Sequence, residues 1–471
     1  MKTESQAPWQ YSPVTLQDMM ARREQRALTQ RQLISRHGCP VLSFTMNIAG
    51  PIKRSALIDW GFALALQRIS RALKGAGKEI AEEVLVLEST GCEMLCACYA
   101  DASELKRLAV ILELQDAFGR LMDADVLDVN GQKISRDDLG IPPRRCLLCD
   151  APAFLCSRAR RHPLNELTEA TEALLRNALI EDFADRTGHN ASQSLIVEAF
   201  TTPKPGLVDM DNSGAHDDMD FSTMMISALA LRGYFSACAR EGAARAVPMP
   251  AVVMPHLRTL GLQAEQTMLN ATGGVNTHKG AIYGLGILCG AAGMLRRSGA
   301  ALTADALLTT AGCIASDETR QLSRLAQEGK CTAGVRQYIV YGIQGARGQA
   351  ARGFPAVREA LSVYQACLDG GMGSTEAAVR TLIHLMATVE DTNVIHRAGW
   401  QRSQQLMREA GDMISQGFTL EDVRALDKQL TEEGISPGGC ADLLAFTEFT
   451  LLMVREEAAR NSMMDVFASR Q

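Results

Sequence analysis

The sequence GGVNTHKGAIYGLGILCGAAGML, at residues 273–295, joins a glycine-rich polar turn to a long run without charged residues. The run over 281–295 is shorter than a membrane span and rich in glycine, so it predicts a tightly packed, buried helix. The glycines before it let backbone N–H groups converge, and a helix N-terminus beside a lysine favours a bound anion. The turn lacks the Walker spacing, so alone it is a weak signal for phosphate.

The segments on both sides of this run show helical spacing of apolar residues and almost no alternation of the strand type. Alanine, leucine, methionine and glutamine dominate, and all four are good helix formers. Further helices are expected over 167–187, 192–200, 221–239, 256–269, 302–328, 376–389 and 420–429. The sequence therefore predicts a C-terminal domain over 166–471 that is an all-α helical bundle.

The N-terminal third has a different pattern, which predicts an α+β domain over 1–165 around a small sheet. Helical spacing covers 57–73 and 105–118, and two strands are expected over 84–87 and 94–99, joined by a turn at 89–91. An Asn130-Gly131 pair predicts a further hairpin turn. The basic, proline-containing segment 157–165 is interpreted as a linker, which puts the domain boundary near residue 165.

Two aspartates precede that hairpin turn, in the segment GRLMDADVLD at residues 119–128. Strand alternation places Asp123 and Asp125 on one face, within reach of one metal ion. Paired carboxylates of this kind hold the metal that positions a triphosphate in nucleotidyl transferases. The pattern alone is weak, and a solvated strand edge is the alternative.

Residues 202–220 crowd carboxylates around one histidine and one lysine. These carboxylates repel one another unless a cation lies among them, and Mg²⁺ prefers such hard oxygen ligands together with substrate phosphates. Lys204 stands between two prolines, which could hold its ammonium group on a stiff backbone beside a phosphate. A solvated acidic loop is the alternative interpretation.

Two further polar groups adjoin expected helices, EDTN at 390–393 followed by HR at 396–397, and GISPGGCAD at 434–442. Together with the strings TPKPGLVD (202–209), GAHDDMD (214–220) and GVNTHKGAIY (274–283), they resemble the signatures of the triphosphoribosyl-dephospho-CoA synthase family. The resemblance covers roughly residues 170 to 460, and its strings are rare and specific.

The front third resembles the citrate lyase holo-carrier synthase family, the phosphoribosyl-dephospho-CoA transferases, over about residues 10 to 165. The likeness rests on SFTMN (43–47), GPIK (50–53), STGCE (89–93), GR (119–120), SRDDLG (135–140) and RCLLC (145–149). It implies a nucleotidyltransferase-like small sheet.

Each resemblance implies one step of the same short pathway. The rear domain would join ATP to 3'-dephospho-CoA at ribose C1 and release adenine. The front domain would then move the product onto a serine of the citrate lyase acyl carrier subunit and release pyrophosphate. The implied cofactor is Mg²⁺, and the implied partners are ATP, 3'-dephospho-CoA and that carrier subunit.

The resemblances also assign roles to residues of this sequence. In the rear domain the expected metal and acid/base set is Asp209, Asp218, Asp220 and Asp391, with Mg²⁺ on Asp218 and Asp220. His216 and His278 are candidates for protonating the leaving adenine, because histidine titrates near neutrality. The expected substrate- and phosphate-binding residues are Lys204, Asn212, Gly274, Asn276, His278, Lys279, Asn393 and Arg397.

In the front domain Asp123 and Asp125 would bind Mg²⁺ on the triphosphate, while Lys53 and Arg120 offset its remaining charge. The base for the carrier's serine is expected among Glu93 and Asp137.

Composition fits an ordinary globular chain of 471 residues, with 46% hydrophobic and 22% charged residues. A net charge of −6 argues against a nucleic-acid partner. The polar N-terminus lacks the apolar core of a secretory signal, and no segment predicts a membrane span. Thirteen cysteines, many in apolar contexts, suggest reduced thiols in the cytoplasm.

One cysteine group has the composition of a metal site. Cys146, Cys149, Cys156 and His162 offer three thiolates and an imidazole, which suits tetrahedral structural zinc. Their spacing is looser than that of a known finger, so reduced, packed cysteines are the alternative.

Three other functions stay open at this point. A metal-dependent, aspartate-rich helical site could hydrolyse ADP-ribosylated proteins, with water in place of the dephospho-CoA hydroxyl. The chain could be a zinc-organised scaffold without turnover. The carrier could belong to malonate decarboxylase, which uses the same prosthetic group.

Overall fold

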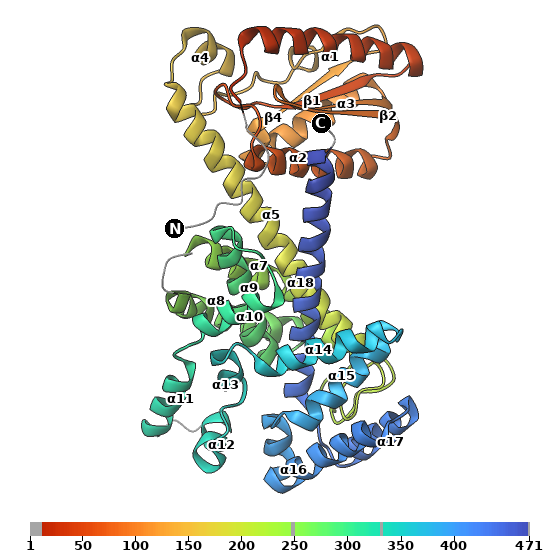
Figure 1. Cartoon of the computed structure of the whole chain (residues 1–471), viewed down its shortest axis with the longest axis vertical. Helices are drawn as coiled ribbons and strands as arrows, with labels where there is room; N and C mark the ends of the chain where they lie inside the picture. Colours follow the sequence, from red (N-terminus) through yellow and green to blue (C-terminus); the bar gives the residue numbers. More distant parts are fainter. Residues whose placement is uncertain (1–11, 246–249, 330–332, 470–471) are drawn as a thin grey trace. The chain divides into compact units, whose positions relative to one another are not determined.

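The computed structural model describes residues 12–245, 250–329 and 333–469 (Figure 1). The chain divides into two compact units, one with the residues up to Leu179 together with those from Asn461 on, and the other over Ile180–Arg460. Residue 165, where the sequence analysis divides the chain, lies in the first turn of helix α5 (Leu164–Phe200). The boundary near residue 165 stays a prediction.

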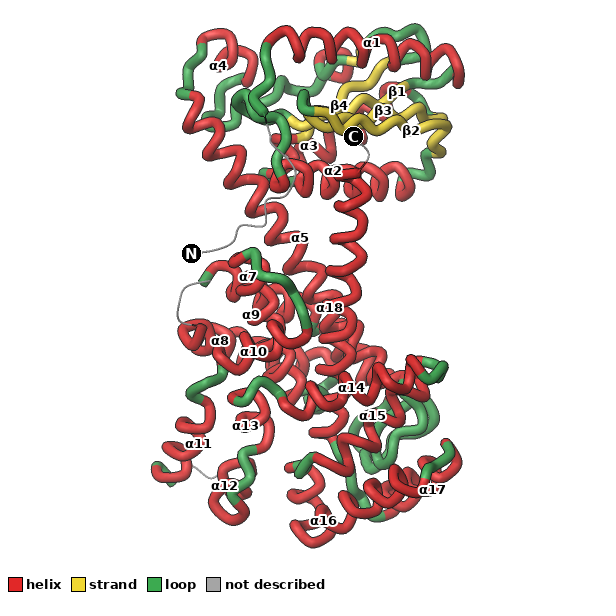
Figure 2. The backbone as a smooth tube through the Cα atoms, viewed as in Figure 1, coloured by secondary structure: helices red, strands yellow, loops and turns green. Residues whose placement is uncertain are grey.

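The first unit is built on a 5-stranded antiparallel sheet with the strand order β2-β3-β1-β4-β5. Its strands are β1 (Val41–Met46), β2 (Glu79–Glu88), β3 (Gly91–Tyr99), β4 (Met122–Leu127) and β5 (Lys133–Ile134). Its helices are α1 (Leu16–His37), α2 (Ala56–Gly75), α3 (Ala102–Leu114), η1 (Phe118–Leu121), η2 (Asp137–Leu139) and α4 (Ala153–Ala159), followed by the start of α5. Figure 2 shows the sheet between α1 on one side and α2 with α3 on the other.

The two faces of the sheet differ because side chains alternate along each strand. On the side of α2, Phe44 of β1 is buried and its ring stacks on Phe62 of α2 with centroids 5.3 Å apart. On the side of α1, Val41 packs in a small cluster with Leu33 of α1. The remaining part of that second face carries the polar ends of β1, β3 and β4.

The second unit is helical throughout the residues that the structure describes there. Its helices after α5 are α6 (Phe221–Ala230), α7 (Arg232–Ala244), η3 (Pro250–Val253), α8 (Met254–Ala271), α9 (Lys279–Ser298), α10 (Ala304–Ile314), α11 (Glu318–Gln327), α12 (Ala333–Tyr341), α13 (Gly345–Ala351), α14 (Pro355–Asp369), α15 (Ser374–Thr388), α16 (Thr392–Gln416), α17 (Leu420–Glu432) and α18 (Gly438–Ser469).

Helix α9 is the buried centre of this unit, as its apolar sequence predicts. Its backbone comes very close to that of α7, since a Cβ built on Gly293 would lie 2.0 Å from the carbonyl oxygen of Ala239. A Cβ on Gly242 of α7 would likewise lie 2.0 Å from the carbonyl oxygen of Gly290. Glycine at these positions is therefore a requirement of the packing.

Helices α5 and α18 run side by side through the second unit (Figure 1). Arg186 and Asn190 of α5 both donate hydrogen bonds to the carboxylate of Glu456 on α18, each at 2.6 Å. The ends of these helices that carry Glu198 and Asp442 lie at the candidate site described below.

Most of the expected elements are confirmed: the helix over 57–73 is α2, the two strands are β2 and β3, and the Asn130-Gly131 turn joins β4 to β5. Some boundaries differ. The expected helices 167–187 and 192–200 form the single helix α5, while 221–239 and 302–328 each divide into two helices. Helix α1 and strand β1 had not been predicted. At this coarse level the structure confirms a small antiparallel sheet in front and a helical remainder.

Candidate functional site

A cavity of about 840 Å³ lies in the second unit and gathers the polar segments of the sequence. It is lined by the end of α5, the loop after it, the N-terminus of α9, residues 343–354, residues 388–397 and the N-terminus of α18. Of the rear-domain residues selected from the sequence, the cavity lining includes Lys204, His216, Asp218, Asn276, His278, Lys279, Asp391, Asn393 and Arg397.

A buried ion pair forms one wall of the cavity. Lys204 is 1% exposed, and its Nζ donates to Oε1 of Glu198 at 2.5 Å. Glu198 comes from the last turn of α5 and is itself buried. Burial raises the pKa of the Glu198 carboxyl, while the Lys204 ammonium opposes that rise. The ammonium of Lys204 therefore balances a protein carboxylate, which the sequence analysis had not included.

Asp209 organises the loop that carries Lys204. Its carboxylate accepts from the backbone N–H groups of Lys204 (3.0 Å), Asp211 (2.8 Å) and Asn212 (3.1 Å). Burial raises the pKa of Asp209, while these backbone donors oppose that rise. Asp209 does not line the cavity, so its contacts are those of a residue that shapes the loop.

Asn212 and Asp220 also act on the backbone around the cavity and do not line it. The side chain of Asn212 donates to Asp427 of α17 at 2.9 Å, and Asp427 also accepts from the backbone N–H of Gly206. Asp220 is the N-cap of α6, where its Oδ1 accepts from the backbone N–H of Thr223 at 2.8 Å. The hydrogen bond from the Thr223 hydroxyl, and then the one from its backbone N–H, lower the pKa of Asp220.

Glu198, Asp391 and Asp442 all line the cavity, and the first two are close enough for their charges to affect the third. Burial raises the pKa of Asp442 well above its usual range, and the charges of Glu198 and Asp391 raise it further. The carboxylate of Asp442 lies over the first turn of α9, where a Cβ on Gly280 would be 1.9 Å from its Oδ2. Only the absence of a side chain at Gly280 makes room for this carboxylate.

Asp391 is the N-cap of α16 and is buried. Its carboxylate accepts from the backbone N–H groups of Asn393 (2.7 Å), Val394 (3.4 Å) and Cys440 (2.9 Å). Burial raises the pKa of Asp391, and these donors oppose the rise. Asp391 thus ties the start of α16 to the start of α18 at the cavity wall.

His216 lies at the mouth of the cavity between charges of both signs. Its Nε2 is 2.9 Å from the Ser436 hydroxyl, and its Nδ1 is 3.7 Å from Oδ1 of Asp218. Arg397 approaches the same Nδ1 at 3.4 Å. Burial and then the Arg397 charge lower the pKa of His216, while Asp218 opposes them. The imidazole is therefore neutral near neutral pH.

His278 is buried at the N-cap of α9 with one ring nitrogen still available. Its Nδ1 is 2.7 Å from the Ser227 hydroxyl, which also accepts from the Thr277 hydroxyl at 2.7 Å. Its Nε2 has no hydrogen-bond partner among the described residues. Burial, and then the charge of Lys204, lower the pKa of His278 to about 3, so the ring stays neutral.

The remaining predicted residues lie at the open side. Lys279 pairs with Glu265 at 2.8 Å, and Arg397 donates to the carbonyl oxygens of Ala215 (3.1 Å) and Gly434 (3.2 Å). Asn276 and Asn393 are exposed cavity residues. Gly274 has φ +98° and does not line the cavity, so its contribution is to the turn before α9.

Several cavity residues had no role in the sequence analysis, namely Glu198, Tyr283, Gln344, Gln349, Arg352, Ser436 and Asp442. Glu198 had one available signal, because it is a charged residue inside the apolar run 195–200. The glutamines and Arg352 come from a segment that carries no motif, and only the fold brings them to the cavity.

The first unit carries the second candidate site. Asp123 and Asp125 lie on the same face of β4, with Thr45 and Ser43 of β1 directly opposite them. Asp123 accepts from Arg144 at 3.1 Å, and Asp125 accepts from Lys133 at 2.7 Å. Burial raises the pKa of Asp123, an effect that Arg144 opposes.

A buried glutamate anchors the cations around this pair. Glu113 of α3 contacts Arg136 through a short hydrogen bond and Arg144 at 3.3 Å, and it accepts from the backbone N–H of Ala124 at 3.1 Å. Lys106 of the same helix donates to the carbonyl oxygen of Ala124 at 2.8 Å. The sequence analysis gave no role to these four charged residues, of which Lys106, Arg136 and Arg144 form a basic rim beside the acidic pair and Glu113 holds the two arginines.

Other front-domain predictions lie in different surroundings. Lys53 donates to the carbonyl oxygen of Ile48 at 2.6 Å, and burial lowers its pKa. Arg120 is half-buried in η1. Glu93 is buried and accepts from Arg22 (2.7 Å) and Arg26 (2.5 Å) of α1, so both of its oxygens already have partners.

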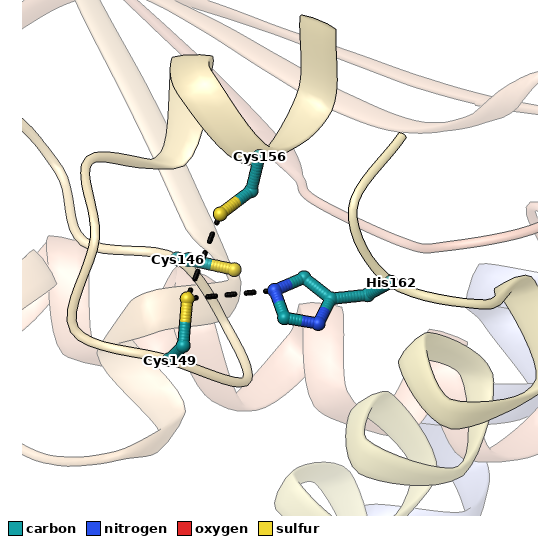
Figure 3. Close-up of side chains that lie close together, drawn as sticks. All are labelled: Cys146, Cys149, Cys156 and His162. Carbon is teal, nitrogen blue, oxygen red and sulfur yellow. Dashed lines mark hydrogen bonds between the residues drawn. The ribbon is translucent and has the colours of Figure 1, made fainter. Parts of the chain in front are cut away.

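The cysteine group predicted as a metal site comes together in the first unit (Figure 3). It is the only set of three or more metal-ligating side chains found this close together in the described part of the chain. Among those same residues, no helix is both long and apolar enough to span a membrane.

Two family matches divide the sequence in the same order as the two sites. Residues 14–178 match the apo-citrate lyase phosphoribosyl-dephospho-CoA transferase family, and residues 184–461 match the ATP:dephospho-CoA triphosphoribosyl transferase family. Both matches lie within the described ranges except for the short gaps at 246–249 and 330–332.

Similar proteins carry both regions. The chain is 33% identical over 453 residues to Protein CitXG of Haemophilus influenzae, covering 93% of this chain and 96% of that protein. It is 31% identical over 460 residues to Protein CitXG of Leuconostoc mesenteroides subsp. cremoris, covering 94% and 97%. It is also 34% identical over 331 residues to the 2-(5''-triphosphoribosyl)-3'-dephosphocoenzyme-A synthase of Haemophilus ducreyi, covering 65% and 99%.

These matches extend over nearly the whole chain and include each candidate site. The chain therefore belongs to the ATP:dephospho-CoA triphosphoribosyl transferase family, with an apo-citrate lyase phosphoribosyl-dephospho-CoA transferase region before it, and is a bifunctional transferase that makes and transfers the citrate lyase prosthetic group.

Proposed function

We propose that the cavity of the second unit is where the ribosyl group of ATP passes to a hydroxyl of 3'-dephospho-CoA. The observation that carries this proposal is the convergence of Glu198, Asp391 and Asp442 on one cavity beside an unpartnered His278 Nε2. Carboxylates stabilise the positive charge that develops at C1 of ribose as adenine leaves. A cavity of about 840 Å³ falls within the size range of small-molecule and cofactor sites.

Asp442 is the proposed acid of this reaction. Burial, and then the charges of Glu198 and Asp391, raise the pKa of this carboxyl and so favour its protonated form, from which a proton could pass to the leaving adenine. Asp391 uses its oxygens for three backbone donors, which supports a positioning role. His278, whose ring is neutral, is proposed to donate a hydrogen bond from Nε2 to the substrate, because the Ser227 hydroxyl lies at its other nitrogen.

His216 is the proposed base. A neutral imidazole can accept the proton of the attacking hydroxyl, and its lowered pKa keeps it neutral. Asp218, at 3.7 Å from Nδ1, would stabilise the imidazolium that forms. Lys279, Arg397 and the N-terminus of α9 are proposed to hold the triphosphate, since each places positive charge or N–H groups at the open side.

The carboxylates of Asp218 and Asp220 fit a magnesium ion only in part. The Asp218 side chain is 65% exposed and free to reach an ion on a triphosphate, whereas Asp220 is committed to capping α6. We propose that Asp218 and substrate phosphates would hold Mg²⁺, which would offset phosphate charge.

The test is adenine release from ATP and Mg²⁺ by the purified chain, with and without 3'-dephospho-CoA, followed by chromatography. Release should depend on 3'-dephospho-CoA and fall on the order of 100-fold in Asp442→Asn. Asp412→Asn, a change at an exposed position of α16, is the matched control and should keep full release. Release without the acceptor would indicate hydrolysis and overturn the proposal.

The front site is proposed to be nucleotidyltransferase-like, with Asp123 and Asp125 holding Mg²⁺ on the triphosphate of the intermediate. Their carboxylates share one face of β4, which fits a bound divalent ion. Arg144 and Lys133, now paired with these aspartates, would turn to the phosphates, and Lys53 and Arg120 are proposed to add charge at a greater distance. The carrier's serine would attack phosphorus and release pyrophosphate.

Transfer to the carrier is tested by labelling the citrate lyase acyl carrier subunit and detecting the mass increase on its serine. Asp123→Asn should abolish labelling and keep adenine release, and Glu104→Gln, an exposed change on α3, should keep both. Loss of both activities in Asp123→Asn would contradict two separate sites. Faster labelling of a malonate decarboxylase carrier would reassign the acceptor. The cytoplasmic location expected from the cysteines stays a prediction.

A further inference from the structure

Four potential ligand atoms meet in the segment between β5 and α5. The Sγ atoms of Cys146, Cys149 and Cys156 and a ring nitrogen of His162 all lie within 4.8 Å of one another. Figure 3 shows the sulfurs and the imidazole pointing at a common centre. Cys149 Sγ is 3.5 Å from Cys156 Sγ and 3.4 Å from Nε2 of His162. Four donors around one point is the arrangement of a tetrahedral metal site.

The backbone between Cys146 and Cys149 forms a tight turn whose N–H groups point at the sulfur of Cys146. The N–H of Cys146 donates to the carbonyl oxygen of Ala151 at 2.7 Å. The backbone N–H groups of Leu148 and Cys149 donate hydrogen bonds to the sulfur of Cys146. Hydrogen bonds of this kind orient a thiolate and stabilise its charge, as the outer contacts of a metal ligand do.

Few apolar side chains of this segment pack against the core of the unit. Leu147 packs against the core of the unit, but three other large apolar side chains of the segment lie at the surface, with Leu148 at 37%, Phe154 at 49% and Leu155 at 51% exposure. The buried side chains at its centre are Cys146 and Cys156. A short segment with so little core generally needs a covalent or metal crosslink to hold one conformation.

We propose that Cys146, Cys149, Cys156 and His162 bind one structural zinc ion. Three thiolates and one neutral imidazole form a closed set that leaves no position for substrate, and thiolate sulfur favours zinc over the magnesium proposed for the two reactions. Binding displaces the thiol protons to solvent, and no oxidation or reduction takes part.

The zinc site has a direct connection to the acidic pair through Arg144. The carbonyl oxygen of Arg144 accepts from the backbone N–H of Ala153 at 2.7 Å, within the metal-organised segment. The side chain of Arg144 reaches Asp123 at 3.1 Å and Glu113 at 3.3 Å. The zinc would therefore hold the backbone from which the Arg144 side chain reaches the transferase site, a consequence that rests on the proposed function of that site.

The first test is the metal content of the full chain, purified under reducing conditions without added metal and measured by inductively coupled plasma mass spectrometry. We expect about one zinc per chain, and near none in Cys149→Ser. Cys313→Ser, a change at an exposed cysteine of α10, is the matched control and should keep the metal. Equal zinc in Cys149→Ser and the parent would overturn the proposal, as would iron in place of zinc or a Cys149–Cys156 disulfide.

Cobalt substitution gives a second readout that is independent of activity. The Co²⁺-loaded parent should show thiolate charge-transfer bands and the visible bands of a tetrahedral site, and the Cys149→Ser protein should lose them. Absence of these bands in the parent would argue against the ligand set.

Activity separates the zinc site from its connection to the transferase. Cys149→Ser should lower carrier labelling on the order of 100-fold through the displaced Arg144. Adenine release should stay unchanged, because the proposed site of that reaction lies in the other unit, and it shows that the second unit is intact. If the parent binds zinc, and Cys149→Ser loses the zinc but labels the carrier at the parent's rate, only the role of Arg144 is overturned. A parent that binds zinc but neither releases adenine nor labels the carrier would overturn the proposed function alone.

Discussion

Replacing Lys204 with methionine removes a positive charge from the interior of the second unit and leaves its carboxylate partner in place. The side chains of Lys204 and Glu198 are 1% and 4% exposed, and their charged atoms are 2.5 Å apart. Methionine keeps most of the length and apolar packing of the lysine stem. The substitution therefore isolates the loss of the ammonium group.

The expected cost follows from the burial of both partners. Removing one member of a buried ion pair destabilises a protein by about 3–5 kcal/mol, because the other charge is left without a partner. Burial already raises the pKa of Glu198, so without Lys204 this carboxyl takes up a proton more readily and limits the cost. We expect a loss of about 3 kcal/mol at neutral pH, and a smaller loss as the pH falls and Glu198 is protonated.

Urea unfolding followed by tryptophan fluorescence measures this loss. The chain has 3 tryptophans, and Trp9 and Trp60 are replaced with phenylalanine. The remaining Trp400, whose ring stacks on that of Tyr341 with centroids 5.2 Å apart, then reports on the second unit alone. The shift in midpoint multiplied by the slope of the transition gives the change in the free energy of unfolding.

A double variant and a surface pair provide the controls. Adding Glu198→Gln to Lys204→Met should restore at least half of the lost stability, since no buried charge then remains unpaired, but it should not restore adenine release. Arg424→Met breaks an exposed pair with Glu421 and should change stability by less than about 0.5 kcal/mol. If Lys204→Met lowers the free energy of unfolding by less than about 1 kcal/mol, an effect as small as that of a surface substitution, the reasoning is refuted.

Three other predictions use the same assays. His278 takes up a proton below about pH 6.5 in the unfolded chain but only near pH 3 in the folded chain, so this residue makes the free energy of unfolding fall as the pH falls. His278→Gln should remove up to about 1.4 kcal/mol per pH unit of that fall. Urea midpoints measured between pH 7 and pH 4 give the difference. Gly280→Ala should displace the Asp442 carboxylate and lower adenine release on the order of 100-fold, whereas Gly411→Ala, with open space around it, should leave release unchanged. Glu113→Gln should release the arginines beside the acidic pair and lower carrier labelling on the order of 100-fold, and unchanged labelling would show that their placement does not matter.

The sequence predicted the elements whose signals are local. The helix of α9 follows from its apolar run, and the hairpin between β4 and β5 follows from Asn130-Gly131, because each signal is contained within a few neighbouring residues. Strand β1 had no such signal, since its Ser43 and Thr45 alternate toward a polar face that only the paired strand β4 explains. Helix α1 has a polar sequence with few buried residues, so its periodicity is weak.

The candidate sites were predictable where a motif is continuous in sequence. Residues from four separate polar segments meet at one cavity, but sequence could not separate the aspartates that face it from those that hold the backbone. Asp209 and Asp218 are nine positions apart in one acidic stretch, yet the first caps backbone N–H groups and the second points to solvent at the cavity. The partners of these groups come from distant helices, as Glu198 and Asp427 illustrate.

The close backbone approach of α7 and α9 has a consequence for how the cavity can respond to substrate. Helix α9 cannot rotate or slide without forcing Gly290 and Gly293 against the carbonyl oxygens and backbone of α7, so its N-terminus is a fixed wall. Any adjustment on binding must then come from the other walls of the cavity, among them residues 343–354 and 388–397. Crosslinking α7 to α9 should therefore leave turnover intact, whereas a crosslink between residues 343–354 and 388–397 should lower it.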